Sequence, residues 1–470
     1  MKSLQVKFIL IGFAISLIFS IINISFFDKY EVSTDLKEQH AMIKGDNAAY
    51  WYEAALIDKG MKNKNFFEAG PKFYNAYLPS KINLLFSKMF NFDLTNDNFK
   101  KITPDNITEF NWITLNKKKN FLLLFQSCLF YFSIYLLSKN IGNFLSKEKS
   151  LFVILFLSIE PTLLQWHSSF WTESIFLSLQ IILLYLVFEK KLTITKTILI
   201  GLCLGFMYLQ RSASIFFPII IFTYIFFDKK KDFTKIFITS ASALVLVISF
   251  LGYHNFKRSG DFYVIPSQQK EAFKIYLNDH ILAGSKNISV KEASIENNYN
   301  YNQWLVKNNI TLSSNLLPSN EKEEREYYKF IQNYSLNLFK ENPLVLLQFI
   351  IKKSLHTGVL DPVHVYFFHK YEYKSKNPYH LSKDHQNWIL PRILYTICIY
   401  FFCLIGLIYL LKNYKKNIFF TGLILISSLY FFFILSWMGN PRYFVPSLIY
   451  LSFFFGIGFH ETLNYLKKIK

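Results

Sequence analysis

Cysteine is scarce in this sequence, and the positions of the few that occur argue against two kinds of site. All four cysteines lie inside apolar runs; they are Cys128, Cys203, Cys398 and Cys403. Their spacing fits neither a disulfide framework nor a zinc site. We interpret them as small apolar packing residues. The sequence also lacks internal repeats and low-complexity tracts.

Acidic residues are few relative to basic ones. The chain has 32 aspartates and glutamates against 52 lysines and arginines, which gives a net charge of +20. Such an excess is common in nucleic-acid-binding proteins. The lysines, however, cluster in the short gaps between apolar runs, which is the signal that orients membrane proteins. We therefore expect membrane lipids as partners and no nucleic acid.

Long apolar runs dominate the chain, in which 52% of the residues are hydrophobic and 19% aromatic. The run from Phe8 to Phe27 is too long for the apolar part of a typical signal peptide, and no small-x-small cleavage site follows it. The pattern predicts an all-α polytopic membrane protein with about ten transmembrane helices. Their expected ranges are 7–27, 119–138, 151–166, 170–188, 196–210, 213–227, 235–253, 390–411, 417–437 and 442–460.

Two long polar stretches divide these helices into groups. We expect a first transmembrane helix over 1–27, a first extracytoplasmic loop over 28–118, helices two to seven over 119–253, a second extracytoplasmic region over 254–388, and helices eight to ten over 389–470. Both polar stretches contain charged residues, asparagine and aromatic residues, which favours folded segments over linkers.

Lysine placement predicts the orientation. With a cytoplasmic N-terminus, the cytoplasmic gaps and the C-terminal tail hold Lys139, Lys147, Lys149, Lys190, Lys191, Lys196, Lys229, Lys230, Lys231, Lys235, Lys412, Lys415, Lys416, Lys467, Lys468 and Lys470. The short gaps on the other side hold only Arg211 and Arg442 as cations. The positive-inside rule thus predicts that both termini are cytoplasmic.

This orientation requires that the run from Pro343 to Leu360 does not cross the membrane. Lys352 and Lys353 lie in the middle of its apolar pattern, which favours an amphipathic helix on the membrane surface over a span.

The abundance of lysine, asparagine, isoleucine and phenylalanine suggests an AT-rich bacterial genome. We therefore place the protein in a bacterial inner membrane.

Ionisable side chains at membrane depth are costly, so each one is a candidate for function. Glu160 and Glu173 bracket the turn between the third and fourth predicted helices, Arg211 ends the fifth, and Arg442 opens the tenth. Asp46 follows the first helix. All five are expected near the extracytoplasmic surface, where converging acids and bases would form a site.

Each of these residues also has a structural explanation. Asp46 could cap a helix that begins at Asn47. Glu160, next to Pro161, could accept hydrogen bonds from a helix N-terminus, and Glu173 could interact with a helix dipole. The two arginines could be interfacial anchors.

The histidines are weaker candidates. Five of them lie in or after the predicted surface helix, at spacings that match no familiar metal motif; they are His356, His364, His369, His380 and His385. We interpret these five as interfacial or surface residues. His167 lies between Glu160 and Glu173 and is the better candidate by position.

Taken in order, the motifs resemble the GT-C glycosyltransferase superfamily, and within it the protein O-mannosyltransferase and lipid A aminoarabinose transferase group. That family has an acidic residue in the first extracytoplasmic loop, followed by a tyrosine and a helix, which Asp46, Tyr50 and Ala54 match. It then has a proline-containing helix end and a Thr-Asp or Thr-Glu pair, which Pro161 and Thr172-Glu173 match.

Later motifs continue the resemblance. A glycine-rich helix that ends near an arginine matches 201–205 and Arg211, and an Arg-Tyr pair before a late helix matches Arg442, Tyr443 and Pro446. No Asp-x-Asp pair occurs near Asp46, so a metal-dependent mechanism of the oligosaccharyltransferase kind is less supported. The resemblance makes no cofactor certain and leaves a divalent metal compatible with the site.

The resemblance implies transfer of a hexose or pentose from a polyprenyl-phosphate-linked donor to a glycan, glycolipid or protein acceptor, in cell-envelope synthesis and by a single inverting displacement. Asp46 would take the acceptor proton. Arg211 and Arg442 would stabilise the departing phosphate. The other expected site residues are Glu173 as a second catalytic acid and Tyr50, Glu160, His167 and Tyr443 as substrate contacts.

Two other classes of protein have similar hydropathy. A polysaccharide polymerase or ligase would be expected to concentrate its arginines in large outer loops, whereas Arg211 and Arg442 lie at helix ends. A membrane transporter would more typically bury its charges near the bilayer midplane and show related halves, which we do not find. The membrane glycosyltransferase is therefore the favoured function, with these two as alternatives.

Overall fold

The computed structural model describes residues 2–28, 50–51, 53–55, 58, 77–95, 117–167, 172–259, 262–264, 272–310, 321–357, 383–436 and 444–469. Within these ranges the chain forms helices and no β-strand, so the all-α prediction is confirmed there. Four helices within the described ranges are long and apolar enough to cross a membrane, over Ser3–Ile21, Phe121–Asn143, Phe233–Phe256 and Ile393–Lys412. The chain is a membrane protein.

Each predicted transmembrane segment overlaps a helix of the structure. The helices are α1 (Lys2–Asp28), α4 (Phe121–Asn140), α5 (Lys147–Ile159), α6 (Pro161–His167), α7 (Glu173–Val187), α8 (Ile194–Gln210), α9 (Phe217–Asp228), α10 (Phe233–Ser259), α17 (Lys383–Lys412), α18 (Tyr414–Ser436) and α19 (Val445–Ile469). Several are too short to qualify as full spans by themselves, among them α7, α8 and α9. The number of crossings therefore stays a prediction.

One predicted helix is divided in two. The prediction of one unbroken helix over 151–166 is wrong, because α5 ends at Ile159 and α6 begins at Pro161. Glu160 between them has an extended backbone, with φ −62° and ψ 122°. Proline disfavours the helical conformation in the residue before it and is well suited to the first position of a new helix. The sequence Glu160-Pro161 thus ends one helix and starts the next.

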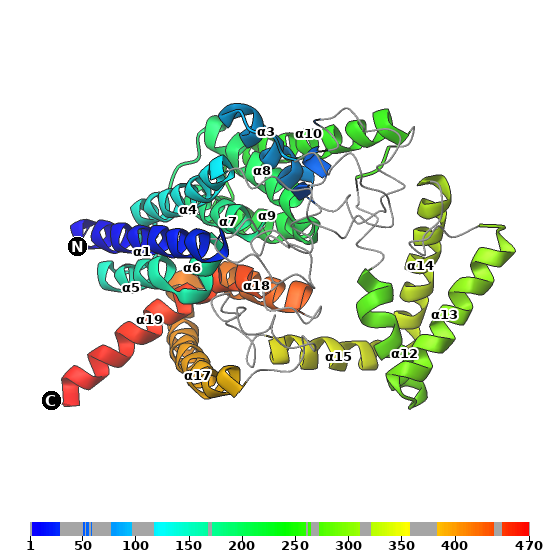
Figure 1. Ribbon diagram of the computed structural model, residues 1–470. Helices are drawn as coiled ribbons and strands as arrows, with labels where there is room; N and C mark the ends of the chain where they lie inside the picture. The colour runs from blue at the N-terminus through cyan, green and yellow to red at the C-terminus, as the bar shows by residue number, and fades with distance from the viewer. Residues whose placement is uncertain are drawn as a thin grey trace.

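The helices pack as one apolar bundle, in which α4 lies against α7, α8 against α10, and α19 against both α5 and α17 (Figure 1). Its core includes Phe130, Leu184 and Phe453, each with no exposed surface. Large apolar side chains also cover the outside, for example Leu246, which is 70% exposed. In water such a surface would be costly, and in a bilayer it contacts lipid.

The helices α17 and α19 approach each other at two glycines. A Cβ atom on Gly406 would collide with the carbonyl oxygen of Phe454, and one on Gly458 with the carbonyl oxygen of Phe402. Small residues at such crossings let two backbones come close inside a membrane. The absence of a side chain at these two positions therefore sets the distance between the helices.

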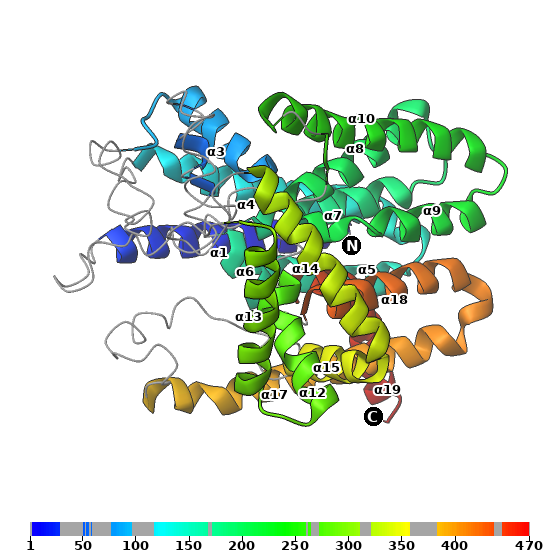
Figure 2. The same cartoon turned by 90° about the vertical axis from the view of Figure 1, so that its right-hand side faces the viewer.

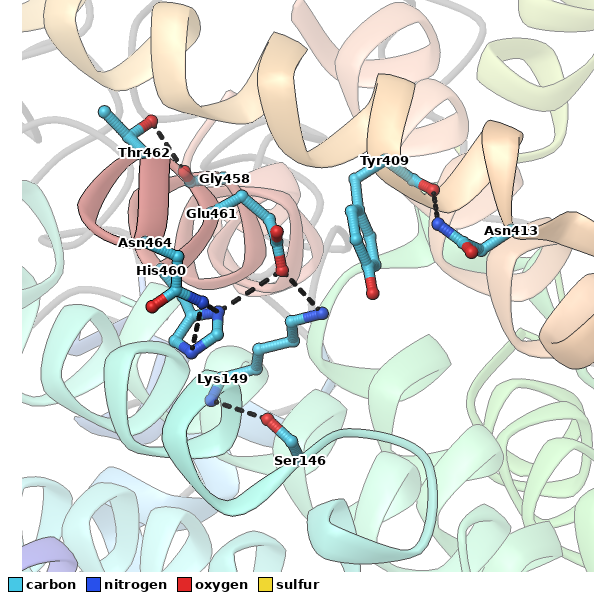
Figure 3. Close-up of polar contacts among 9 residues, drawn as sticks. All are labelled: Ser146, Lys149, Tyr409, Asn413, Gly458, His460, Glu461, Thr462 and Asn464. Carbon is cyan, nitrogen blue, oxygen red and sulfur yellow. Dashed lines mark hydrogen bonds and ion pairs between the residues drawn. The ribbon is translucent and has the colours of Figure 1, made fainter. Parts of the chain in front are cut away.

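A buried lysine joins three helices at the start of α5. Lys149 lies 2.8 Å from the carboxylate of Glu461 on α19, and its ammonium group lies 3.6 Å from the ring centroid of Tyr409 on α17 (Figure 3). Only 11% of the Lys149 side chain is exposed. From the sequence, we interpret Lys149 only as one of the lysines that predict the orientation in the membrane. In the structure it is also an interhelical contact, stabilised by an opposite charge and an aromatic face.

A second group of helices lies beside one end of the bundle (Figures 1 and 2). It consists of α12 (Asp279–Lys286), α13 (Val290–Lys307) and α14 (Glu321–Glu341), which we call the helical unit. Ser289 and Glu292 form a capping box at the start of α13. The helix α15 (Pro343–Leu355) follows the unit and contacts α12, α14 and the membrane helix α18.

We expect Gly458→Val to destabilise the fold by about 1–3 kcal/mol, because the added side chain forces α17 and α19 apart. The matched control is Gly422→Val on α18, since a Cβ atom on Gly422 meets nothing within 4 Å. The melting temperature of the purified protein in detergent measures both. Equal melting temperatures for the two variants would contradict the close approach.

The contact between α12 and α15 should depend on pH through His280, which stacks on Phe349 with ring centroids 4.7 Å apart. Burial and the charge of Lys353 lower the pKa of His280, against the opposing effect of Asp279. The unfolded chain, with a pKa of about 6.5, therefore binds the proton first as the pH falls. Stability contributed by the neutral imidazole is present above that pH and is lost below it.

Hydrogen exchange of the α15 amides measures this effect. We expect faster exchange at about pH 5.5 than at about pH 7.5, after correction for the intrinsic exchange rate, and loss of the difference in His280→Gln. The control is His356→Gln, which removes an exposed histidine at the end of α15. If His356→Gln abolished the difference and His280→Gln did not, the assignment to His280 would be wrong.

Candidate active site

The end of α8 and the start of α7 bring two of the predicted site residues together. Arg211 follows the last residue of α8 with an extended backbone, and Glu173 is the first residue of α7. A nitrogen of the Arg211 guanidinium lies 3.0 Å from Oε1 of Glu173. The side chains are 9% and 1% exposed, respectively. Because α7 and α8 pack side by side, their ends hold this ion pair inside the protein.

Neighbouring polar groups hold the pair in position. The side-chain amide of Gln210 donates a hydrogen bond to the carbonyl oxygen of Thr172 over 2.9 Å, and the Thr172 hydroxyl donates to Oε2 of Glu173 over 3.3 Å. The Arg211 guanidinium also lies 5.8 Å from the ring centroid of Phe176. A buried ion pair is tolerated only when its groups are both paired and hydrogen-bonded, as they are here.

Gln210 is a polar residue that sequence reasoning did not select. It is 1% exposed, and its carboxamide oxygen has no hydrogen-bond partner among the residues that the structure describes. A buried, unsatisfied acceptor is unfavourable in an isolated protein and is ready to accept a donor from a ligand. The sequence feature that could have identified Gln210 as a site residue is its position directly before Arg211, at the end of an apolar helix.

Glu160 occupies a separate position, between α5 and α6. It is 3% exposed, and its Oε2 accepts a hydrogen bond from the backbone N–H of Leu163 over 2.8 Å. Its Oε1 accepts from the hydroxyl of Tyr395 on α17 over 3.1 Å. Glu160 thus caps α6 and ties it to α17, so the structural explanation suggested by the sequence holds. A small cavity with Tyr395, Thr396 and Phe444 in its wall adjoins this carboxylate.

The segment after Asp46 is described at Tyr50, Trp51 and 53–55, which are helical. Trp51 is fully buried, and Glu53 accepts a hydrogen bond from Ser80 on α3 (Tyr77–Phe90). Tyr50 is half-buried. This part of the first polar stretch is therefore packed against a helix that itself contacts α4 and α8.

Three of the predicted site residues, Asp46, Arg442 and Tyr443, lie outside the described residues. His167 ends α6, and its side chain lies outside the description. The structure thus brings Glu173 and Arg211 together and places Glu160 on the neighbouring turn. Convergence of Asp46 and Arg442 on this pair stays a prediction.

Metal ligands do not gather in the part of the chain that the structure describes, where no group of three histidine, cysteine, aspartate or glutamate side chains could hold an ion. The two candidate carboxylates there are already engaged, Glu173 by Arg211 and Glu160 by its hydrogen-bond donors. These residues do not fit a divalent metal site, and we derive no step through one.

We expect Glu173→Gln to destabilise the protein by about 3–5 kcal/mol, because it leaves the Arg211 charge buried without its counterion. The control is Glu189→Gln at the surface pair of Glu189 and Lys196, whose side chains are 20% and 30% exposed. Loss of that pair should cost about 0–1 kcal/mol. Chemical unfolding in detergent measures both, and similar losses would contradict a buried ion pair at Glu173.

Comparison with known proteins gives a likeness in fold alone. No family model and no curated protein sequence matches the chain. Among solved structures, it is similar to the oligosaccharyltransferase AglB of Archaeoglobus fulgidus, in complex with an inhibitory peptide and a dolichol-phosphate. The identity is 12%, the TM-score is 0.51, and the match covers 99% of this chain and 51% of AglB.

A second structure of the A. fulgidus oligosaccharyltransferase, in complex with Zn and sulfate, matches with 11% identity and a TM-score of 0.51. This match covers 97% of the chain and 49% of the other protein. The chain therefore spans about half the length of the solved structures that it matches. Over that half it shares the fold of the archaeal oligosaccharyltransferase.

Proposed function

We propose that this protein is a membrane glycosyltransferase that moves a sugar from a polyprenyl-phosphate-linked donor to an acceptor on the extracytoplasmic face. The observation that carries the proposal is the buried pair of Glu173 and Arg211, held at two helix ends in a GT-C-like fold. A fixed cation at the edge of an apolar bundle suits a ligand that joins a phosphate to a long apolar chain. The AglB structure contains such a ligand, a dolichol-phosphate.

The chemistry follows from where charge develops. The acceptor oxygen or nitrogen attacks the anomeric carbon as the bond from that carbon to the phosphate oxygen breaks. Negative charge grows on the departing polyprenyl phosphate, and Arg211, with Arg442, stabilises it through charge-assisted hydrogen bonds. Asp46 accepts the proton that the acceptor loses. The result is a single inverting displacement.

The remaining residues position these groups. Glu173 fixes the guanidinium of Arg211, so that it is oriented before the donor arrives. Glu160 holds the turn between α5 and α6 through its contacts with Leu163 and Tyr395. We assign Tyr50, His167 and Tyr443 to substrate contacts.

The setting of this reaction is also part of the proposal. We place the protein in a bacterial inner membrane with both termini in the cytoplasm, as the lysine distribution predicts. The transferred sugar is a hexose or pentose, and the acceptor is a glycan, glycolipid or protein of the cell envelope. Within the superfamily we assign the chain to the protein O-mannosyltransferase and lipid A aminoarabinose transferase group.

Deletion of the gene from its host should remove one sugar from a cell-envelope glycan or glycolipid, and mass spectrometry should detect the loss as one hexose or pentose mass. The wild-type gene should restore the sugar. Asp46→Asn and Arg211→Gln should restore less than about 1%, because loss of a base or of transition-state charge stabilisation costs a factor of about 10² or more.

Glu189→Gln serves as the control variant and should restore the sugar fully, since it changes a surface pair at the other end of α7. Immunoblots of membrane fractions measure the amount of each variant, and the restored sugar is compared per amount of protein, because Arg211→Gln also leaves the buried Glu173 without its counterion. If the deletion changed no glycan, the glycosyltransferase proposal would be overturned in favour of a transporter. If the deletion shortened a polymer by many units, a polymerase or ligase would replace it.

A further inference from the structure

The helix α15 has one face that is fixed to the helical unit. Val345, Leu346 and Phe349 pack against a buried apolar cluster that includes Ile281 and Leu282 of α12. At the closest point, a Cβ atom on Gly284 would lie 2.6 Å from Cγ1 of Val345, so α12 has no room for a side chain there. This face of α15 is therefore part of a packed core.

The opposite face of α15 is apolar and open. Leu344, Leu347, Ile351 and Leu355 are 72%, 54%, 39% and 46% exposed, respectively. Their spacing of three, four and four residues puts them in one line along the helix. An isolated exposed leucine is common on protein surfaces, but an aligned row of four marks a surface that a partner covers.

Charge and position indicate which partner this is. Lys352 is exposed beside the apolar row, and 342–360 contains no aspartate or glutamate. An apolar face bordered by lysines is typical of helices that lie in the headgroup region of a membrane. The helix α15 also contacts α18 of the apolar bundle, which places it beside the bilayer (Figures 1 and 2).

We infer that α15 docks the helical unit onto the membrane surface, with the row from Leu344 to Leu355 inserted among the lipids and Lys352 bound to an anionic headgroup. The occupant of this face is the bilayer surface itself. The inference does not rest on glycosyl transfer, because it concerns how the unit is held and not what the site does.

A photoreactive residue tests the contact. Benzoylphenylalanine replaces Leu347 in the full chain, which is reconstituted in vesicles of phosphatidylcholine and phosphatidylglycerol and then illuminated. The control replaces Val306, which is 73% exposed and belongs to α13, the helix of the unit that lies farthest to the right of the bundle in Figure 1. Mass spectrometry of the peptides identifies the adducts, and circular dichroism verifies the helical content of each variant.

We expect lipid adducts at position 347 and none at position 306. The adduct yield with phosphatidylglycerol should fall about fivefold in Lys352→Gln, which is the contribution of one lysine near an anionic surface. Lys291→Gln, an exposed lysine on α13, should leave that yield unchanged.

Three results would overturn the inference. Adducts at position 347 with the same chain or with a second copy would show that protein covers this face. Equal lipid adducts at positions 347 and 306 would remove the distinction between the two faces. A yield that is the same in vesicles without phosphatidylglycerol would exclude the role given to Lys352.

Discussion

The pairing of Glu173 with Arg211 is the interaction on which the candidate site depends. Neither charge could remain inside an apolar bundle alone, because desolvation of an isolated ion costs several kcal/mol. Each residue therefore requires the other, and both require α7 and α8 to end at the same level. The ion pair can form only if α7 and α8 pack in this arrangement, and the arrangement is stable only if the two charges pair.

The breaks on either side of α6 are where the buried carboxylates Glu160 and Glu173 lie. Glu160 and Pro161 end α5 and begin α6, and the free backbone N–H groups of α6 bring the Glu160 carboxylate to Leu163. The same turn reaches across to Tyr395 on α17. A break in one helix is thus stabilised by a side chain from another, far along the chain.

The charged side chains at the two ends of the bundle have different surroundings. At the end with Glu173 and Arg211, one ion pair is buried, and its guanidinium lies near the ring of Phe176. At the start of α5, Lys149 lies between Glu461 and Tyr409 and joins α5, α17 and α19 (Figure 3). Beside the bundle, α15 carries Lys352 at the edge of an apolar row, where a charged group remains hydrated and costs little.

The sequence by itself determined the helical class of this protein, the approximate position of each apolar segment, and the short set of ionisable residues worth attention. Hydropathy and charge are properties of single residues and their neighbours, so they can be read along the chain. Pairing is different, because Glu173 and Arg211 are 38 positions apart and the sequence does not say that they touch. Only the tertiary structure decided that they pair, that Gln210 and Tyr395 join the polar contacts, that the third helix is broken at Glu160, and that Lys149 is buried, since each depends on how helix ends align in space.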